Sequence, residues 1–295
     1  MSKFDDMKKL GLIIAMAMLI PVFSIAQEED DPWDFSDREG WSFGLNLGGY
    51  FANKASAIVY NGEALYDIND IQAQVYTIEE RLNLNQQTIQ QVTNLIAAEA
   101  FFIPFDSYPQ LIRYNPGLMV GLHTGYRFNN ENSVFVDINY ANLRAADKFT
   151  LETNLLPDPS QGTSDIRLYN IIGEEDRLNI QAGYRAGLVI NEDMNWYFEG
   201  GGSFLATRMV NNFVEIEGTT FDLWIGTQGG FGNIQGPASN LTATGLGFFG
   251  GTGIEVFFND RYEAHLGLRL SRDQVVLGTF DDILWNRQFF FTVTI

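Results

Sequence analysis

The chain has 295 residues, a formal net charge of −19 at pH 7 and no cysteine. So acidic a chain repels phosphate, which excludes a nucleic-acid-binding protein, and the lack of cysteine excludes disulfides as a source of stability. The 29 glycines, 14% aromatic residues and mean hydropathy of −0.08 suit a barrel with an apolar exterior and a polar interior, although they also suit a secreted β-sandwich.

The first segment, residues 1–26, has the features of a secretory signal peptide. It carries three lysines, an apolar run at 10–20 and a small-residue cleavage pattern that ends at Ala26. Residues 27–39 follow as an acidic leader, which we expect in the periplasm. The sequence therefore predicts an exported protein.

From residue 40 onward the sequence alternates between apolar and small or polar residues, the pattern of strands with two different faces. One of these faces is apolar in every segment, and the segments are separated by polar turn residues. The alternating segments are 41–48, 118–128, 134–141, 177–190, 196–207, 246–258, 262–271 and 285–295. Eight strands, an even number, predict an all-β fold: an eight-stranded antiparallel transmembrane β-barrel over residues 40–295.

The connections between these strands are of two lengths. Short polar turns are expected at 129–133, 191–195 and 259–261, and longer loops at 53–115, 148–174, 209–242 and 274–284. In outer-membrane barrels the short turns face the periplasm and the long loops face the exterior. Both ends of the chain are then periplasmic.

The first long loop, 53–115, contains a stretch with helical periodicity. Apolar residues recur at helical spacing between about 67 and 100, which predicts one helix or a broken pair of helices. Its apolar face needs a cover, which could be the barrel rim, lipid headgroups or another protein. The candidates for contact with a partner are Ile71, Val75, Ile78, Leu82, Phe101 and Phe102.

Several charged residues alternate with the apolar ones and should therefore point into the barrel. They are Arg127, Asp137, Arg185, Glu199, Glu255, Glu263, His265 and Arg269, with Arg177 on the same face. Because an eight-stranded barrel has room only for side chains, we expect a salt-bridged plug, with a proton path or gated pore as the alternative. Strand pairing across the turn places Glu255 opposite His265, so these two should interact. We expect no catalytic, cofactor-binding or metal-binding residues.

The last strand carries outward apolar residues at Phe289, Phe291, Val293 and Ile295, and it should close the barrel against the strand that begins near Trp41. With these features the chain resembles small eight-stranded outer-membrane β-barrels, the OmpA/OmpX-like and PorT-like group. The four residues are similar to the group's assembly signal, which usually ends in Phe. The departure at Ile295 is typical of lineages such as Bacteroidota.

This resemblance implies an outer-membrane location, lipid around the barrel and contact with the barrel-assembly machinery during insertion. It further implies a non-enzymatic scaffold or accessory subunit of a larger outer-membrane complex of the secretion, gliding or barrel-assembly type. The alternatives are an enzyme that acts on lipid or peptide at the exterior rim, and a narrow pore.

Overall fold

The computed structural model describes most of the chain from residue 39 onward, in ranges that all belong to the compact unit Arg38–Ile295. These ranges are 39–63, 73–75, 77–154, 165–191, 193–226, 242–258, 262–277 and 280–295. The predicted signal peptide, nearly all of the predicted leader, Ile71 and the turn at 259–261 lie outside them.

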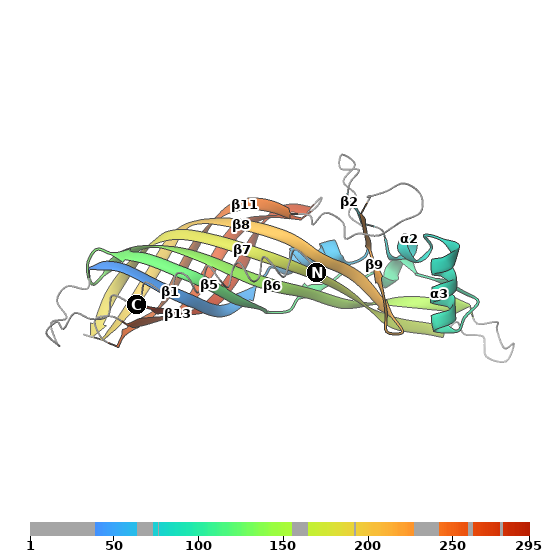
Figure 1. Ribbon diagram of the computed structural model, residues 1–295, viewed down its shortest axis with the longest axis horizontal. Coiled ribbons are helices and arrows are strands. Elements are labelled where there is room, and N and C mark those ends of the chain that lie inside the picture. Colours follow the sequence, from blue (N-terminus) through green and yellow to red (C-terminus); the bar gives the residue numbers. More distant parts are fainter. Residues whose placement is uncertain are drawn as a thin grey trace, which may run out of the picture. The chain divides into compact units, whose positions relative to one another are not determined.

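Eight long antiparallel strands form a closed barrel (Figure 1). They are β1 (Gly40–Phe51), β5 (Gly117–Arg127), β6 (Asn132–Asn154), β7 (Asp165–Asn191), β8 (Met194–Ile216), β11 (Thr242–Phe257), β12 (Glu263–Leu277) and β13 (Phe280–Thr294). Each strand pairs with the next in the chain order, and β13 pairs with β1 to close the ring. The predicted fold class and the predicted pairing of the last strand with the first are confirmed.

The strand registers give the stagger of the ring. A line of paired residues that leaves Trp285 on β13 returns to the same strand at Ile295, ten residues further along. The line passes through Arg272, Phe248, Gly202, Ala182, Val136, Thr124 and Phe43. Eight strands with this stagger enclose an interior that side chains fill.

The outer surface of the barrel is an apolar belt with a defined edge. On β6 the outward residues from Val134 to Tyr140 are apolar and those from Asn142 onward are mostly polar, while most of the inward residues are buried. The belt includes exposed aromatic and aliphatic side chains on neighbouring strands, such as Leu45, Leu118, Leu268 and Phe291. A closed barrel with such a belt satisfies every backbone hydrogen bond in lipid, so we treat it as membrane-spanning.

Beyond the belt edge, β6, β7 and β8 continue as a sheet that forms part of a cap on the barrel (Figure 1). The predicted loops at 148–174 and 209–242 are therefore wrong over much of their length, and so is that at 274–284, where β12 reaches Leu277 and β13 starts at Phe280. After β8, a two-residue turn with positive φ at Glu217 (47°) and Gly218 (77°) leads into β9 (Thr219–Asp222). That geometry is typical of a tight hairpin.

The cap reverses the polarity of the barrel. In the belt the outward side chains are apolar and the inward ones are largely polar, whereas in the cap Phe149, Leu151 and Ile171 point inward into an apolar core and Lys148 and Glu152 point outward. A polar exterior is what water requires, so the reversal marks the passage from lipid to water.

The first loop supplies the other half of the cap. It contains η1 (Lys54–Tyr60), β2 (Ala73–Val75), α2 (Ile78–Leu82), α3 (Gln86–Ile96), β3 (Ala100–Phe102), η2 (Phe105–Ser107) and β4 (Arg113–Tyr114). Strands β3 and β4 pair with the edge of β6, and β2 pairs with β10 (Trp224–Gly226). None of the described helices is long and apolar enough to cross a membrane.

The predicted helix at about 67–100 needs correction. Residues 73–75 form a strand, and two short helices follow, separated at Asn83–Asn85, so the broken pair describes this part better than one helix. Thr77 begins α2 with a reciprocal capping box to Glu80, and the Asn85 side chain caps α3. Each cap satisfies free backbone N–H groups and starts a new helix.

Candidate functional site

The charged residues of the barrel interior lie in successive layers, and the lowest layer is near the short turns. The Arg127 guanidinium donates to Glu255 Oε1 at 2.7 Å and to Glu263 Oε2 at 2.6 Å. His265 lies between the same two carboxylates, with Nδ1 3.3 Å from Glu255 and Nε2 3.1 Å from Glu263. Glu255 and His265, predicted to interact, are thus register partners in contact.

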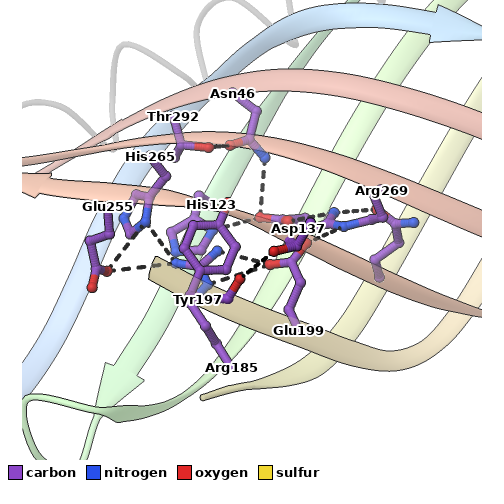
Figure 2. A network of polar contacts seen from close by, with 12 residues as sticks. Asn46, His123, Asp137, Arg185, Tyr197, Glu199, Glu255, His265, Arg269 and Thr292 are labelled. Carbon is purple, nitrogen blue, oxygen red and sulfur yellow. Dashed lines mark hydrogen bonds and ion pairs between the residues drawn. The ribbon is translucent and has the colours of Figure 1, made fainter. Parts of the chain in front are cut away.

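The next layer joins residues from β5, β6, β7, β8 and β12 (Figure 2). Arg269 donates from Nε to Glu199 at 2.7 Å and to Asp137 at 2.9 Å, and Arg185 donates to Glu199 at 3.1 Å. His123 Nδ1 lies 2.6 Å from Asp137. Every charged group of this layer has an opposite charge or a polar ring beside it, as buried charges require.

Aromatic rings fill the space around these guanidinium groups. Arg269 lies over the rings of Phe290 at 4.6 Å and Phe249 at 4.7 Å, and Arg185 lies over Tyr197 at 4.4 Å. Cation–π contacts of this kind favour a buried guanidinium, and the rings occupy the volume that a pore would need. All eight predicted lumen residues therefore lie inside the barrel and form one continuous set of contacts.

A third layer, where barrel and cap meet, was not predicted. Glu175 accepts hydrogen bonds from Arg177 Nε at 2.6 Å, Tyr114 Oη at 2.6 Å and Tyr60 Oη at 3.2 Å. Arg177 also donates to Ser56 Oγ at 3.1 Å. Because Ser56, Tyr60 and Tyr114 belong to the first loop, this layer ties the cap to β7. The one sequence signal is that Glu175 and Arg177 share a strand face.

Asp273 is a second buried acid that sequence reasoning missed. It accepts hydrogen bonds from Ser203, Ser271 and Asn286. Among the described residues neither histidine contacts these serines, because both histidines lie in the lower layers. A nucleophile activated by a base needs the two within hydrogen-bond distance, and this arrangement does not provide it.

Glu255, Glu263 and His265 have ligand atoms within 4.8 Å of one another, which is close enough to consider a metal ion. However, the Arg127 guanidinium already binds both carboxylates. A cation placed between them would meet that positive charge at close range, so the group is better described as an internal ion network.

The predicted assembly-signal residues Phe289, Phe291, Val293 and Ile295 all face outward from β13. Phe289, Phe291 and Val293 pair with Gly49, Leu47 and Leu45 of β1, and Ile295 bonds to the backbone of Phe43. They belong to the apolar belt and to the strand that closes the barrel. Their role in assembly stays a prediction.

The residues predicted to contact a partner differ in their exposure. For Ile78 and Leu82 the prediction of partner contact is wrong, because both side chains are fully buried in the cap core. In this core α2 lies against β9 and α3 lies against β8. The helical face is covered by the chain's own sheet, a fourth possibility beyond the rim, lipid or another protein. Val75 lies in a strand, Phe101 packs partly against the core, and Phe102 is exposed.

No family model matches the sequence, and no curated protein is similar to it. Among solved structures the chain is similar to Neisserial surface protein A, at 10% identity with a TM-score of 0.38, covering 87% of this chain and 96% of the other. It is also similar to the outer membrane protein OprG from Pseudomonas aeruginosa (11%, TM-score 0.36, 87% and 97%) and to Ail of Yersinia pestis (11%, TM-score 0.34, 87% and 97%).

Proposed function

We propose that this chain is a non-enzymatic outer-membrane β-barrel that acts as a scaffold or accessory subunit of a larger outer-membrane complex. The observation that carries this proposal is the direct continuation of β6, β7 and β8 from the barrel into the cap. A cap built from the same strands as its membrane anchor is held rigidly, which suits a protein that presents a fixed surface.

The orientation is part of this proposal. The short turn that follows Arg127 and the paired ends Phe43 and Ile295 lie at the end of the barrel away from the cap. We place that end in the periplasm and the cap outside the cell, with export by the predicted signal peptide. A source among the Bacteroidota is favoured by Ile295 at the end of the assembly signal.

The filled interior supports an anchor over a pore. The layers around Arg127, Arg269 and Arg177 cross the lumen at three heights, and each is closed by ion pairs and rings. Separating a buried arginine from its carboxylate partners would cost several kcal/mol of free energy, so these layers do not open readily. No contact in the described residues favours the alternative enzyme.

The outer face of the cap sheet offers a surface for the partner. Phe102, Ile166 and Leu168 are exposed there, and the register places Phe102 and Ile166 on either side of Glu152. Leu168 lies ten residues beyond Leu178, about 33 Å along β7, so these side chains are not part of the belt. Exposed apolar groups well outside lipid are typical of protein contacts.

The test is the mass of the assembly that contains the chain, extracted from its own outer membrane in mild detergent. We expect the wild type in a complex of fixed stoichiometry, and the double variant Ile166→Asn, Leu168→Asn as a folded monomer. Thr150→Asn, which changes the register partner of Leu168 on the same face, is the matched control and should keep the complex. A wild-type protein that elutes as a monodisperse monomer would refute the subunit role, and a double variant that keeps the complex would refute this surface.

A further inference from the structure

Four arginines face outward at the cap-side edge of the apolar belt. Arg144 follows Tyr140 and Asn142 on the outward face of β6, Arg208 follows Phe204 and Ala206 on β8, Arg272 follows Leu268 and Leu270 on β12, and Arg287 lies between Trp285 and Phe289 on β13. At the turn end of the belt, by contrast, the described arginines Arg127 and Arg185 point inward, and no described lysine or arginine faces lipid there.

Two of the four arginines face a carboxylate of this chain across the strand pair. Arg144 is the register partner of Glu174, and Arg208 is the register partner of Asp176. Opposite-charge pairs placed directly across a sheet attract one another. Each of these two arginines therefore has an opposite charge of this chain as its direct strand partner.

The other two arginines have apolar neighbours on both sides. Arg272 lies between Phe248 of β11 and Trp285 of β13, with its guanidinium 5.7 Å from the Trp285 ring. Arg287 lies between Leu270 and Phe51. Within the part of the chain that the structure describes, neither has a carboxylate as its direct strand partner.

Arg272 and Arg287 are also diagonal neighbours, since Arg272 pairs with Trp285, two residues from Arg287. Diagonal positions on adjacent strands are about 7–8 Å apart, close enough for both guanidinium groups to reach one anion. Without that anion two like charges lie side by side at the edge of lipid. The planar guanidinium binds phosphate oxygens in a bidentate manner, so phosphate is the anion that we expect at this pair.

The surroundings favour a lipid phosphate over a free ion. The rings of Phe248 and Trp285 meet edge to face at 6.2 Å beside Arg272, and the apolar belt continues directly from Leu270 and Phe289. A lipid with its phosphate at the belt edge would place its acyl chains on this surface. Basic residues at a membrane boundary bind anionic headgroups in this way.

We propose that Arg272 and Arg287 form a binding site for the phosphate headgroup of a lipid in the leaflet on the cap side. The lipid is held by two guanidinium groups on adjacent strands and by the aromatic surface beside them. This site goes beyond the scaffold role and does not depend on it, because it involves the barrel and lipid alone.

The test uses the full chain in neutral detergent micelles, with dioleoyl phosphatidic acid as the probe and native mass spectrometry to count bound lipid. Each arginine near a lipid surface contributes roughly a fivefold change in binding, so Arg272→Gln, Arg287→Gln should weaken binding about 25-fold. The matched control Arg144→Gln, whose arginine faces Glu174, should stay within about twofold of the wild type. Arg272→Lys, Arg287→Lys keeps the charge but loses the bidentate geometry, so this variant should bind the lipid more weakly than the wild type and more tightly than the double Gln variant.

Inorganic phosphate added at millimolar concentration should leave the lipid bound. The proposal is overturned if the double Gln variant binds the lipid as the wild type does, if Arg144→Gln loses as much binding, or if inorganic phosphate displaces the lipid. The first two results would show that the pair is not the site, and the third would show a small-anion site. Heat-dependent migration on gels establishes that each variant is folded.

Discussion

Replacing Arg269 by methionine tests whether the lumen network stabilises the barrel. The guanidinium of Arg269 binds Glu199 and Asp137 and lies over three aromatic rings, those of Phe135, Phe249 and Phe290. Methionine keeps much of the volume and the contact with the rings but removes the charge. The perturbation is therefore largely electrostatic.

The expected loss in the free energy of unfolding depends on the partners that Glu199 and Asp137 keep in the variant. Removing one partner of a buried ion pair typically costs about 3–5 kcal/mol, because the other charge stays buried without compensation. Glu199 still has Arg185 at 3.1 Å, and Asp137 still has His123 at 2.6 Å, so neither acid is left alone. We therefore expect the lower end, about 3 kcal/mol.

Arg272→Met is the matched control, since Arg272 is three residues further along the same strand and faces outward. In phosphatidylcholine vesicles without anionic lipid its cost should stay within about 0.5 kcal/mol. The assay is reversible urea unfolding followed by tryptophan fluorescence, with the free energy taken from the midpoint and the slope. A loss below about 1 kcal/mol for Arg269→Met, or an equal loss for Arg272→Met, would refute the reasoning.

Three further predictions concern the cap and the lumen. A Cβ atom at Gly173 would clash with the ring of Tyr60, so Gly173→Ala should open the cap to limited proteolysis and leave the barrel resistant; cleavage as slow as in the wild type would contradict this. Deleting residues 67–100 removes cap core but no barrel strand, so heat-dependent gel migration should persist, and its loss would show that barrel and cap fold as one. In planar bilayers the wild type should give no stable current steps, because the side-chain layers fill the lumen, and reproducible steps would show that they open.

The barrel could be predicted from the sequence because lipid imposes one rule on every strand. Outward residues must be apolar and inward ones need not be, so alternation alone identified all eight strands. The pairing of the last strand with the first and the contact of Glu255 with His265 followed from chain order and parity. These are local patterns, which a single sequence contains in full.

The cap could not be predicted in the same way because water replaces lipid there. The segment Lys148 to Glu152 still alternates, but its apolar residues Phe149 and Leu151 point inward. They stand at odd positions, whereas the outward apolar residues earlier in the same strand stand at even positions, so the pattern of one continuous lipid-facing strand is interrupted. The contacts of Glu175 with Tyr60 and Tyr114 join residues 115 and 61 positions apart. No periodicity within one segment encodes such pairs.

The layer around Glu175 and Arg177 lies where the two polarities of the molecule meet. Below it the interior is ionic and the exterior apolar, and above it the interior is apolar and the exterior polar. A carboxylate at this height is stabilised by Arg177 of the same strand and by Tyr60 and Tyr114 of the first loop, so moving the cap would take away the two tyrosine donors of a buried acid. That cost opposes any hinge between barrel and cap. A rigid cap favours presentation of a fixed surface over gating of the lumen.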